Sequence, residues 1–428
     1  NTTTMDQLEE IIRSATQAVD VPGVVLAASS ATGKYEILTG GLYYEKAFGV
    51  RSLKEGQTPE PMTVNNVFYL ASCTKVFTAV AIMQCVEQGL FTLDEDVTRL
   101  LPELEDIEIL RGFDEGTGKP ILVKATKSIT LRHLLSHTSG FHYDHLNPDL
   151  VRWRKSRGEP TGLLIKSLHH RCLTPLVFEP GEKYLYSTGF EWAGFMVERA
   201  TSLNLEEYMK AFIWKSLGIT SMTFHPEMHP EIMSSLADLS TCVGGKNKFG
   251  TVKDPFGKII WKKNFWQSKD NDYSGGAGLF GRATEFIKLL HSITAGDGKL
   301  LKQESIDELF RPQMSDSSRK HLQELTKMKG SNDMASISMP MGSQISFGLG
   351  GGMICLEDVG GLRVSRRAGT MFWKGVPNHY WWADRTSGLC GVYASSLVPT
   401  TDLVSIALNE TFELAMYNKL SRESRVRL

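Results

Sequence analysis

Apolar positions near the start of the chain repeat first with the period of a helix and then with that of strands. Between Met5 and Val19 the apolar side chains lie mostly three or four positions apart, at Leu8, Ile11, Ile12, Ala15 and Val19. This spacing places them on one face and predicts a helix. The stretches VPGVVLAASS and LYYEKAFGV follow, and their β-branched and aromatic residues predict two strands.

The middle and the end of the chain have different patterns. From Leu93 to about residue 310, segments such as LRHLLSHTSG, FEWAGFMVERATS and TEFIKLLHSITAG are apolar at helical spacing and end in glycine or a polar residue. After Phe347 the chain changes to short apolar runs separated by turn residues, which predict an antiparallel meander. In the last segment, 401–420, the first residues fit either a strand or a helix, and the rest fit an amphipathic helix.

Strands at both ends of the chain and helices between them predict an α+β fold. We expect an antiparallel sheet flanked by the terminal helices, with a large, mostly helical domain inserted into it. The sheet domain would comprise residues 1–92 and 311–428, and the inserted domain residues 93–310. The active site is then expected in the cleft between the two domains.

A serine and a lysine three positions apart, Ser72 and Lys75, begin the apolar stretch LASCTKVFTAVAIMQC. On a helix these side chains share a face, and the helix N-terminus favours negative charge on the serine oxygen. Burial among apolar residues would lower the pKa of Lys75, so that it accepts the serine proton. A second Ser-x-x-Lys, Ser317 to Lys320, is flanked by charges. The alternative is that Ser72 only caps the helix while Lys75 extends its ammonium to the surface.

Composition excludes several classes of function. A net charge of -1 and only 22% charged residues give no electrostatic basis for binding nucleic acid or an anionic membrane. Six scattered cysteines without a C-x-x-C pair favour reduced thiols and a cytoplasmic location. The C-terminal Val-Arg-Leu differs by one residue type from a Ser-Lys-Leu peroxisomal signal, which leaves a peroxisomal address as the alternative.

Four sequence landmarks occur in a family-specific order: LASCTKVFTA, ITLRHLLSHTSGF, FEPGEKYLYS and SGGAGLFGRATEF. Together they resemble the serine β-lactamase and penicillin-binding-protein superfamily, in particular its class C-like esterases and the fungal acyltransferases that complete lovastatin-type polyketides. The resemblance implies that Tyr186 is the tyrosine that relays protons beside the nucleophile. The family has Asn two positions later, where this chain has Thr188, which would face the substrate.

The third family motif resembles Trp373-Lys374-Gly375-Val376 on a predicted strand. By this match the backbone N–H groups of Ser72 and Val376 form the oxyanion hole, and Trp373 and Gly375 contact the substrate. Two such donors stabilise the oxyanion that develops during acyl transfer. The alternative is that Trp373 is an ordinary buried strand residue.

Two further patterns have ordinary explanations. His133 and His137 lie four positions apart, as zinc ligands do, but no carboxylate follows at the expected place and we predict no metal site. The stretch GGAGLFG, residues 275–281, lacks the lysine of a phosphate-binding loop and is expected to form a tight turn beside the active site.

These observations together predict a serine acyltransferase without a cofactor. The donor would be a thioester of an acyl carrier protein or of coenzyme A, and the acceptor an alcohol of a polyketide-like small molecule; neither nucleic acid nor a membrane is an expected partner. A hydrolase that uses the same acyl-enzyme, such as an esterase, amidase or weak β-lactamase, is the alternative. A non-catalytic binding protein with this fold is a third hypothesis, which the complete set of Ser72, Lys75 and Tyr186 disfavours.

Overall fold

The computed structural model describes residues 3–31, 41–243, 258–263, 272–327, 339–340, 342–360 and 365–426. Its helices are α1 (Met5–Gln17), α2 (Thr74–Glu87), α3 (Leu131–Leu135), α4 (Pro148–Ser156), α5 (Leu168–Cys172), α6 (Gly189–Thr201), α7 (Leu205–Met209), α8 (Lys215–Leu217), α9 (Pro230–Ser235), α10 (Ala283–Ala295), α11 (Gln303–Phe310), α12 (Asp316–Lys327) and α14 (Leu403–Val426). Within these described ranges, no helix is long and apolar enough to cross a membrane.

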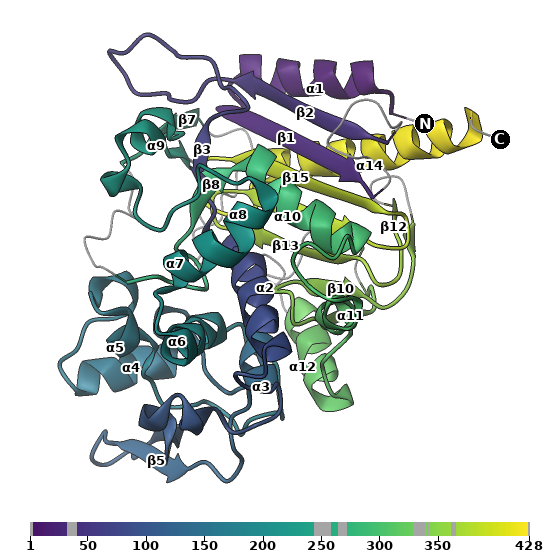
Figure 1. The fold of residues 1–428 in the computed structure, drawn as a ribbon. Coiled ribbons are helices and arrows are strands. Elements are labelled where there is room, and N and C mark those ends of the chain that lie inside the picture. Colours follow the sequence, from purple (N-terminus) through teal and green to yellow (C-terminus); the bar gives the residue numbers. More distant parts are fainter. Residues whose placement is uncertain are drawn as a thin grey trace.

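A seven-stranded antiparallel sheet forms the centre of the fold (Figure 1). Its strands, in spatial order, are β2 (Tyr43–Gly49), β1 (Gly23–Ser30), β15 (Leu389–Ser395), β14 (His379–Asp384), β13 (Met371–Gly375), β10 (Met353–Cys355) and β9 (Ile345–Phe347). The N-terminal hairpin therefore joins the C-terminal meander where β1 pairs with β15, from Val24 opposite Ser395 to Ser30 opposite Leu389. The predicted meander and the joining of the chain ends in one sheet are confirmed.

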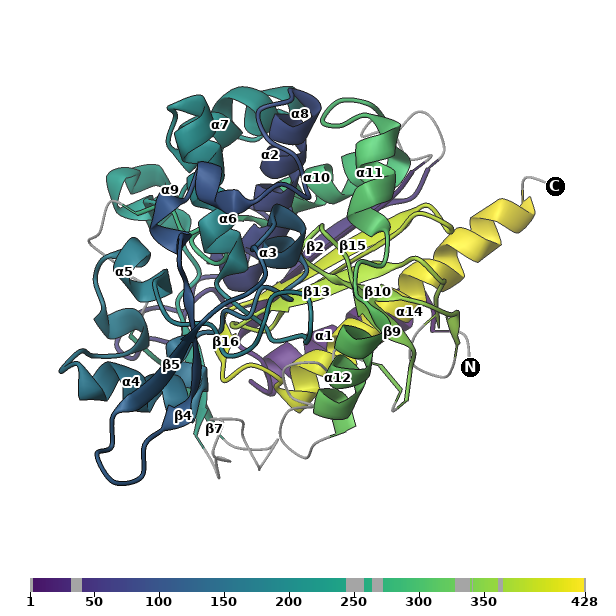
Figure 2. The ribbon, with the colours of Figure 1, turned by 90° about the horizontal axis from the view of Figure 1, so that it is seen from below.

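Helices cover both faces of this sheet. All eight residues of β1 are buried, and because strand side chains alternate between faces, both faces must be covered. Helix α10 lies on one side of the sheet, whereas α1 and α14 lie together on the other (Figure 2). The predicted flanking by terminal helices is correct. The α14 helix begins at Leu403, where the Ser405 N–H donates to the Asp402 carboxylate, so the alternative of a strand at 401 is wrong.

The region between the two parts of the sheet is mostly helical but includes short strands. A hairpin of β4 (Glu108–Phe113) and β5 (Pro120–Lys124) occupies a stretch expected to be helical. Smaller pairings join β3 (Val67–Tyr69) to β8 (Phe280–Arg282), and join β6 (Ser240–Val243) to both β7 (Lys258–Trp261) and β16 (Leu397–Val398); β11 (Val359–Gly360) pairs with β12 (Ser365–Arg366). Helix α10 belongs to the expected insert yet packs on the sheet, and the division at residues 92 and 311 stays a prediction.

Helix α2 lies at the centre of the molecule. Every residue from Thr74 to Cys85 is buried, and the helix packs against α6 and α11. A helix that is apolar on all sides is stable only when it is enclosed in this way. Ser72 lies in the turn immediately before α2. The N-terminus of this helix is therefore held between the helical part of the molecule and the sheet.

Candidate active site

Ser72 lies in a sharp turn between strand β3 and helix α2. Residues Ala71–Cys73 form a single 3-10 turn, and Ala71 has a φ of +47°, a conformation that costs an L-residue energy. Such strain persists only where the surroundings enforce it, and it is frequent at reactive residues. The turn leaves Ser72 partly exposed between two buried neighbours.

The hydroxyl group of Ser72 accepts a hydrogen bond from Tyr186. The Tyr186 Oη to Ser72 Oγ distance is 2.8 Å, and the Trp373 indole N–H in turn donates to Tyr186 Oη at 3.4 Å. The ring of Tyr186 packs between His137, at 4.6 Å, and Trp373, at 5.2 Å between centroids. Three residues that the sequence analysis selected from distant segments are therefore in contact. Ser72 does not cap α2, whose N-cap residue is Cys73, so that alternative is wrong.

Lys75 is completely buried, at 0% exposure, which excludes the alternative of a surface ammonium. Its Nζ donates to the carbonyl oxygen of Gly276 at 2.8 Å and to Tyr143 Oη at 3.5 Å, and it lies 4.7 Å from the centroid of the Tyr186 ring. The sequence analysis expected Lys75 to contact Ser72 directly. Within the described residues, however, Lys75 makes no hydrogen bond to Ser72. The two side chains meet through Tyr186.

The turn at 275–279, which leads into β8, binds the start of α2. Besides the Gly276 carbonyl, the Gly275 carbonyl accepts from Thr78 Oγ1 at 2.7 Å, and the Leu279 N–H donates to Thr74 Oγ1 at 3.0 Å. The turn therefore binds successive residues along α2 through its main chain. The prediction of a tight turn beside the active site agrees with this arrangement.

The second Ser-x-x-Lys pair has none of these features. Ser317 and Lys320 lie on α12 and are both exposed, and the Ser317 hydroxyl pairs only with Ser315 Oγ at 3.0 Å among the described residues. The two Ser-x-x-Lys pairs have the same spacing, and they differ in how deeply their side chains are buried and in which residues they contact.

Thr188 occupies the N-cap position of α6, two residues after Tyr186. It is 3% exposed, and its Oγ1 has no hydrogen-bond partner in the part of the chain that the structure describes. A buried hydroxyl without a partner is costly and needs an explanation. Because protein atoms enclose this oxygen, the expected contact between Thr188 and a substrate stays a prediction.

Strand β13 ends against the turn that carries Ser72. A Cβ atom added at Gly375 would lie 2.5 Å from the Leu70 carbonyl oxygen and 3.3 Å from Cys73 Sγ. Glycine is thus required for this close approach. Val376, the next residue, has 42% of its surface exposed, whereas Trp373 is 4% exposed and faces Tyr186.

Two buried histidines, His137 and His142, contact the segment that carries Tyr186. The Ser187 N–H donates to His137 Nδ1 at 3.1 Å, so Nδ1 is the unprotonated nitrogen, while His142 Nδ1 lies 2.6 Å from the Tyr186 carbonyl oxygen. Burial lowers the pKa of His142 to about 4 and that of His137 well below its usual value. His133 Nδ1 accepts from the Thr130 N–H. Among the described residues, no group of three or more His, Cys, Asp or Glu side chains is placed to hold a metal ion.

Tyr143 and Glu191 also belong to this site, although the sequence analysis did not select them. Tyr143 Oη donates to Glu191 Oε1 at 3.1 Å and lies beside Lys75 Nζ. Glu191 is in the first turn of α6, where acidic residues are common, so its sequence position carries no distinctive signal.

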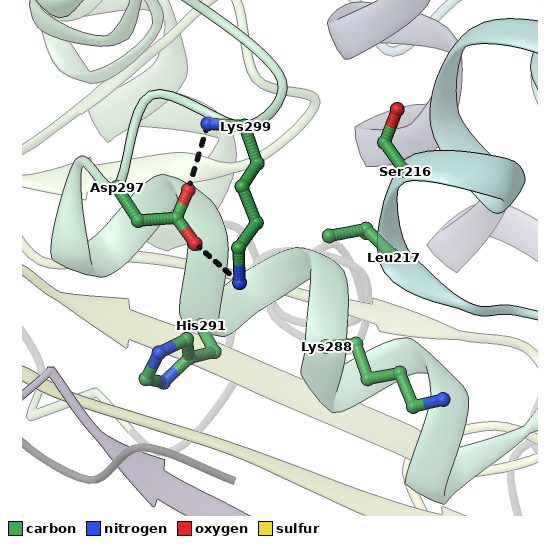
Figure 3. Close-up of a pocket in the computed structure, with 6 residues that line it drawn as sticks. All are labelled: Ser216, Leu217, Lys288, His291, Asp297 and Lys299. Carbon is green, nitrogen blue, oxygen red and sulfur yellow. Dashed lines mark hydrogen bonds and ion pairs between the residues drawn. The ribbon is translucent and has the colours of Figure 1, made fainter.

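A surface depression between α8 and α10 is separate from this group (Figure 3). It is lined by Ser216, Leu217, Lys288, His291, Asp297 and Lys299. Its charged groups already have partners, because Lys288 donates to the Gly218 carbonyl and Lys299 pairs with Asp297. None of its lining residues is a candidate catalytic residue.

Comparison with known proteins identifies the family of this chain. The model of the family Beta-lactamase matches residues 8–412. The chain belongs to the beta-lactamase family. The predicted superfamily and its β-lactamase-like α+β fold are thus confirmed.

Relatives within the beta-lactamase family include transferases and an esterase. The chain is 33% identical over 414 residues to monacolin J acid methylbutanoyltransferase of Aspergillus terreus, covering 96% of this chain and 95% of the relative. It is 31% identical over 425 residues to lovastatin esterase of Penicillium rubens, covering 97% and 98%. A variant of simvastatin synthase from Aspergillus terreus superimposes with a TM-score of 0.85 at 35% identity, covering 97% and 95%. The prediction of an acyltransferase enzyme is confirmed, whereas the roles of the individual residues stay predictions.

Proposed function

We propose that this protein is a serine acyltransferase that moves an acyl group from a thioester through a Ser72 acyl-enzyme to an alcohol. The observation that carries the proposal is the 2.8 Å hydrogen bond between Tyr186 Oη and Ser72 Oγ, next to a fully buried Lys75. A nucleophile in contact with a proton-accepting pair is what covalent acyl transfer requires.

In the first half-reaction Ser72 Oγ attacks the thioester carbonyl carbon, and its proton passes to the pair of Tyr186 and Lys75. The backbone N–H groups of Ser72 and Val376 hold the resulting oxyanion, and the close approach at Gly375 supports this placement. The carbon–sulfur bond then breaks, and the thiolate takes the proton as it leaves. In the second half-reaction the acceptor alcohol gives its proton to the same pair and attacks the carbonyl carbon of the acyl-serine. The bond from that carbon to Ser72 Oγ then breaks, the pair returns the proton to Oγ, and the new ester leaves.

The donor is proposed to be a thioester of an acyl carrier protein or of coenzyme A, and the acceptor an alcohol on a polyketide-like small molecule. The printed names of the relatives support this acceptor class, since one acts on monacolin J acid. Trp373 packs on Tyr186 at 5.2 Å between ring centroids, which places an apolar ring close to the nucleophile. Trp373, Gly375 and Thr188 are the proposed contacts to substrate, and no cofactor takes part.

Hydrolysis of the same acyl-enzyme is the second candidate function. The similarity to lovastatin esterase, over 97% of this chain, favours it. Both reactions use Ser72, Lys75 and Tyr186, and they differ only in whether water or an alcohol reaches the acyl-serine.

Intact-mass analysis with a short-chain acyl thioester tests the proposal. We expect wild type and the control Ser317→Ala to gain one acyl group, and Ser72→Ala to gain none. An acyl adduct that an added alcohol discharges faster than water does would establish transfer, and discharge at one rate with or without alcohol would establish hydrolysis. An adduct that persists in Ser72→Ala would exclude Ser72 as the nucleophile.

A further inference from the structure

Glu191 is a buried carboxylate that the proposed reaction does not use. Its side chain is 3% exposed; Oε1 accepts from Tyr143 Oη at 3.1 Å, and Oε2 is buried without a partner among the described residues. No ion pair to Glu191 forms within those residues. A buried carboxylate needs a nearby positive charge or several donors to offset its lost hydration.

Two contacts connect this carboxylate to Lys75. The first is Tyr143, whose Oη lies 3.1 Å from Glu191 Oε1 and 3.5 Å from Lys75 Nζ. The second is Gly276, whose carbonyl oxygen accepts from Lys75 Nζ at 2.8 Å, and where an added Cβ would lie 2.4 Å from Glu191 Oε1. The carboxylate therefore packs directly on the residue that holds the ammonium.

The direction of the Tyr143 proton completes the connection. Burial, together with the charge of Glu191, raises the pKa of Tyr143 well above its usual value, so the phenol keeps its proton. A phenol has one proton to donate, and here it goes to Glu191. The oxygen lone pairs of Tyr143 are then free to accept from the Lys75 ammonium.

We propose that Glu191 is a positioning residue that, through Tyr143 and against Gly276, orients the Lys75 side chain and balances the positive charge that Lys75 carries once it has accepted a proton. Its catalytic meaning rests on the proposed function, because Lys75 is one of the two proton carriers of that reaction. The charge balance itself does not depend on which substrate is used.

The other titratable groups around this pair do not replace Glu191. Tyr186, His137 and Cys73 lie around Lys75; burial raises the pKa of Cys73 and lowers that of His137, so both are neutral near pH 7. Tyr69 and Cys172 lie within electrostatic reach of Glu191, and burial raises the pKa of each, which keeps them uncharged.

Glu191→Gln tests the proposal, because it keeps the size and an acceptor oxygen but removes the charge. Lysine labelled with ¹³C at Cε is titrated by NMR, with Lys75 assigned by the signal lost in Lys75→Met. We expect the Lys75 midpoint to lie at lower pH in this variant than in wild type, since a neutral neighbour no longer favours the ammonium. The limb of the acylation pH profile that follows Lys75 should move in the same direction.

Glu198→Gln is the matched control, because it removes a carboxylate from the same helix at a position that accepts from the Leu205 N–H instead. The titration midpoint of Lys75 in Glu198→Gln should equal that in wild type. Tyr143→Phe removes the linking hydroxyl and leaves Glu191, and it should also lower the midpoint, which keeps the test available if Glu191→Gln does not fold.

Wild-type midpoints in both Glu191→Gln and Tyr143→Phe would overturn the proposal while leaving the acyl-enzyme function intact. Absence of an acyl adduct on wild type would instead overturn the proposed function. The NMR comparison would still decide whether Glu191 acts on Lys75.

Discussion

The hydroxyl groups of Ser72 and Tyr186 lie 2.8 Å apart although 114 positions separate the two residues in the sequence. Ser72 comes from the turn before α2, and Tyr186 from the segment before α6. Because α2 packs against α6, the two hydroxyls are fixed by the same helix contact that stabilises the fold. Catalytic geometry and core packing are thus coupled at this point.

Removing the Tyr186 hydroxyl should slow acylation strongly and leave the fold intact. Tyr186→Phe keeps the ring between His137 and Trp373 but removes the proton relay, so we expect acylation of Ser72 to slow by about 10²–10⁴-fold. Stability should fall by only about 1 kcal/mol, for one lost hydrogen bond. Time-resolved intact mass and thermal melting measure the two effects.

Tyr184→Phe is the control, since Tyr184 packs on His137 and Phe347 without contacting Ser72. It should acylate at the wild-type rate. Equal acylation rates in Tyr186→Phe and wild type would remove Tyr186 from the mechanism.

Replacing Lys75 should show which of the two Ser-x-x-Lys pairs takes part in acylation. Lys75→Met fits the same buried space but carries no proton, and we expect acylation to fall by about 10²–10⁴-fold with the circular-dichroism spectrum unchanged. The same change at the exposed copy, Lys320→Met, should have no effect on the rate. A fully active Lys75→Met would show that Lys75 serves only the fold.

A methyl group at Gly375 should displace the end of β13 from the nucleophile. Its Cβ would lie 2.5 Å from the Leu70 carbonyl oxygen, which forces the strand or the turn to move. We expect Gly375→Ala to destabilise the protein by about 1–3 kcal/mol and to reduce the acylation rate more than thioester binding. Urea unfolding and single-turnover kinetics separate these effects.

Gly360→Ala is the matched control, because an added Cβ there meets no atom within 4 Å. Stability and rate should stay close to wild type. If Gly375→Ala behaved in the same way, the close approach of β13 would have no role in the site.

Acid should destabilise the fold through the histidines behind Tyr186. The pKa of His142 is lowered to about 4 in the folded state, so the unfolded chain binds the extra proton first as the pH falls. The stability that neutral His142 contributes is complete above about pH 6.5 and is lost progressively as the pH falls to about 4, by up to about 3 kcal/mol.

Urea midpoints at pH 7 and pH 5 measure this loss. In His142→Asn the difference between the two midpoints should be smaller than in wild type, since an amide can bond to the Tyr186 carbonyl without titrating. His229→Gln is the control, because His229 is not among the groups that act on the pKa of His142, and it should keep the wild-type difference. An identical pH dependence in His142→Asn and wild type would exclude this histidine as a source of the acid sensitivity.

Sequence patterns correctly predicted the elements whose apolar and polar residues fit only one kind of secondary structure. The strands of the meander and the buried helix after Ser72 follow from apolar runs and turn residues. The β4–β5 hairpin was missed because β5 is largely exposed and shows no apolar alternation. Residue type could not distinguish Glu191 from an ordinary acidic residue of a first helical turn, and the Gly276 carbonyl that holds Lys75 belongs to the main chain. Tyr186 was found only through the family resemblance.

The pairing of β1 with β15 has a consequence for the synthesis of the chain. Until residues 389–395 have left the ribosome, β1 has no partner on that edge, and its apolar residues stand beside unpaired backbone groups. Trp373, which contacts Tyr186, lies on β13, and this strand is likewise synthesised after the helical region. We therefore expect a nascent chain of this protein to be inactive and prone to aggregate until residue 395 has emerged, and expression yield to depend on chaperones that shield this edge.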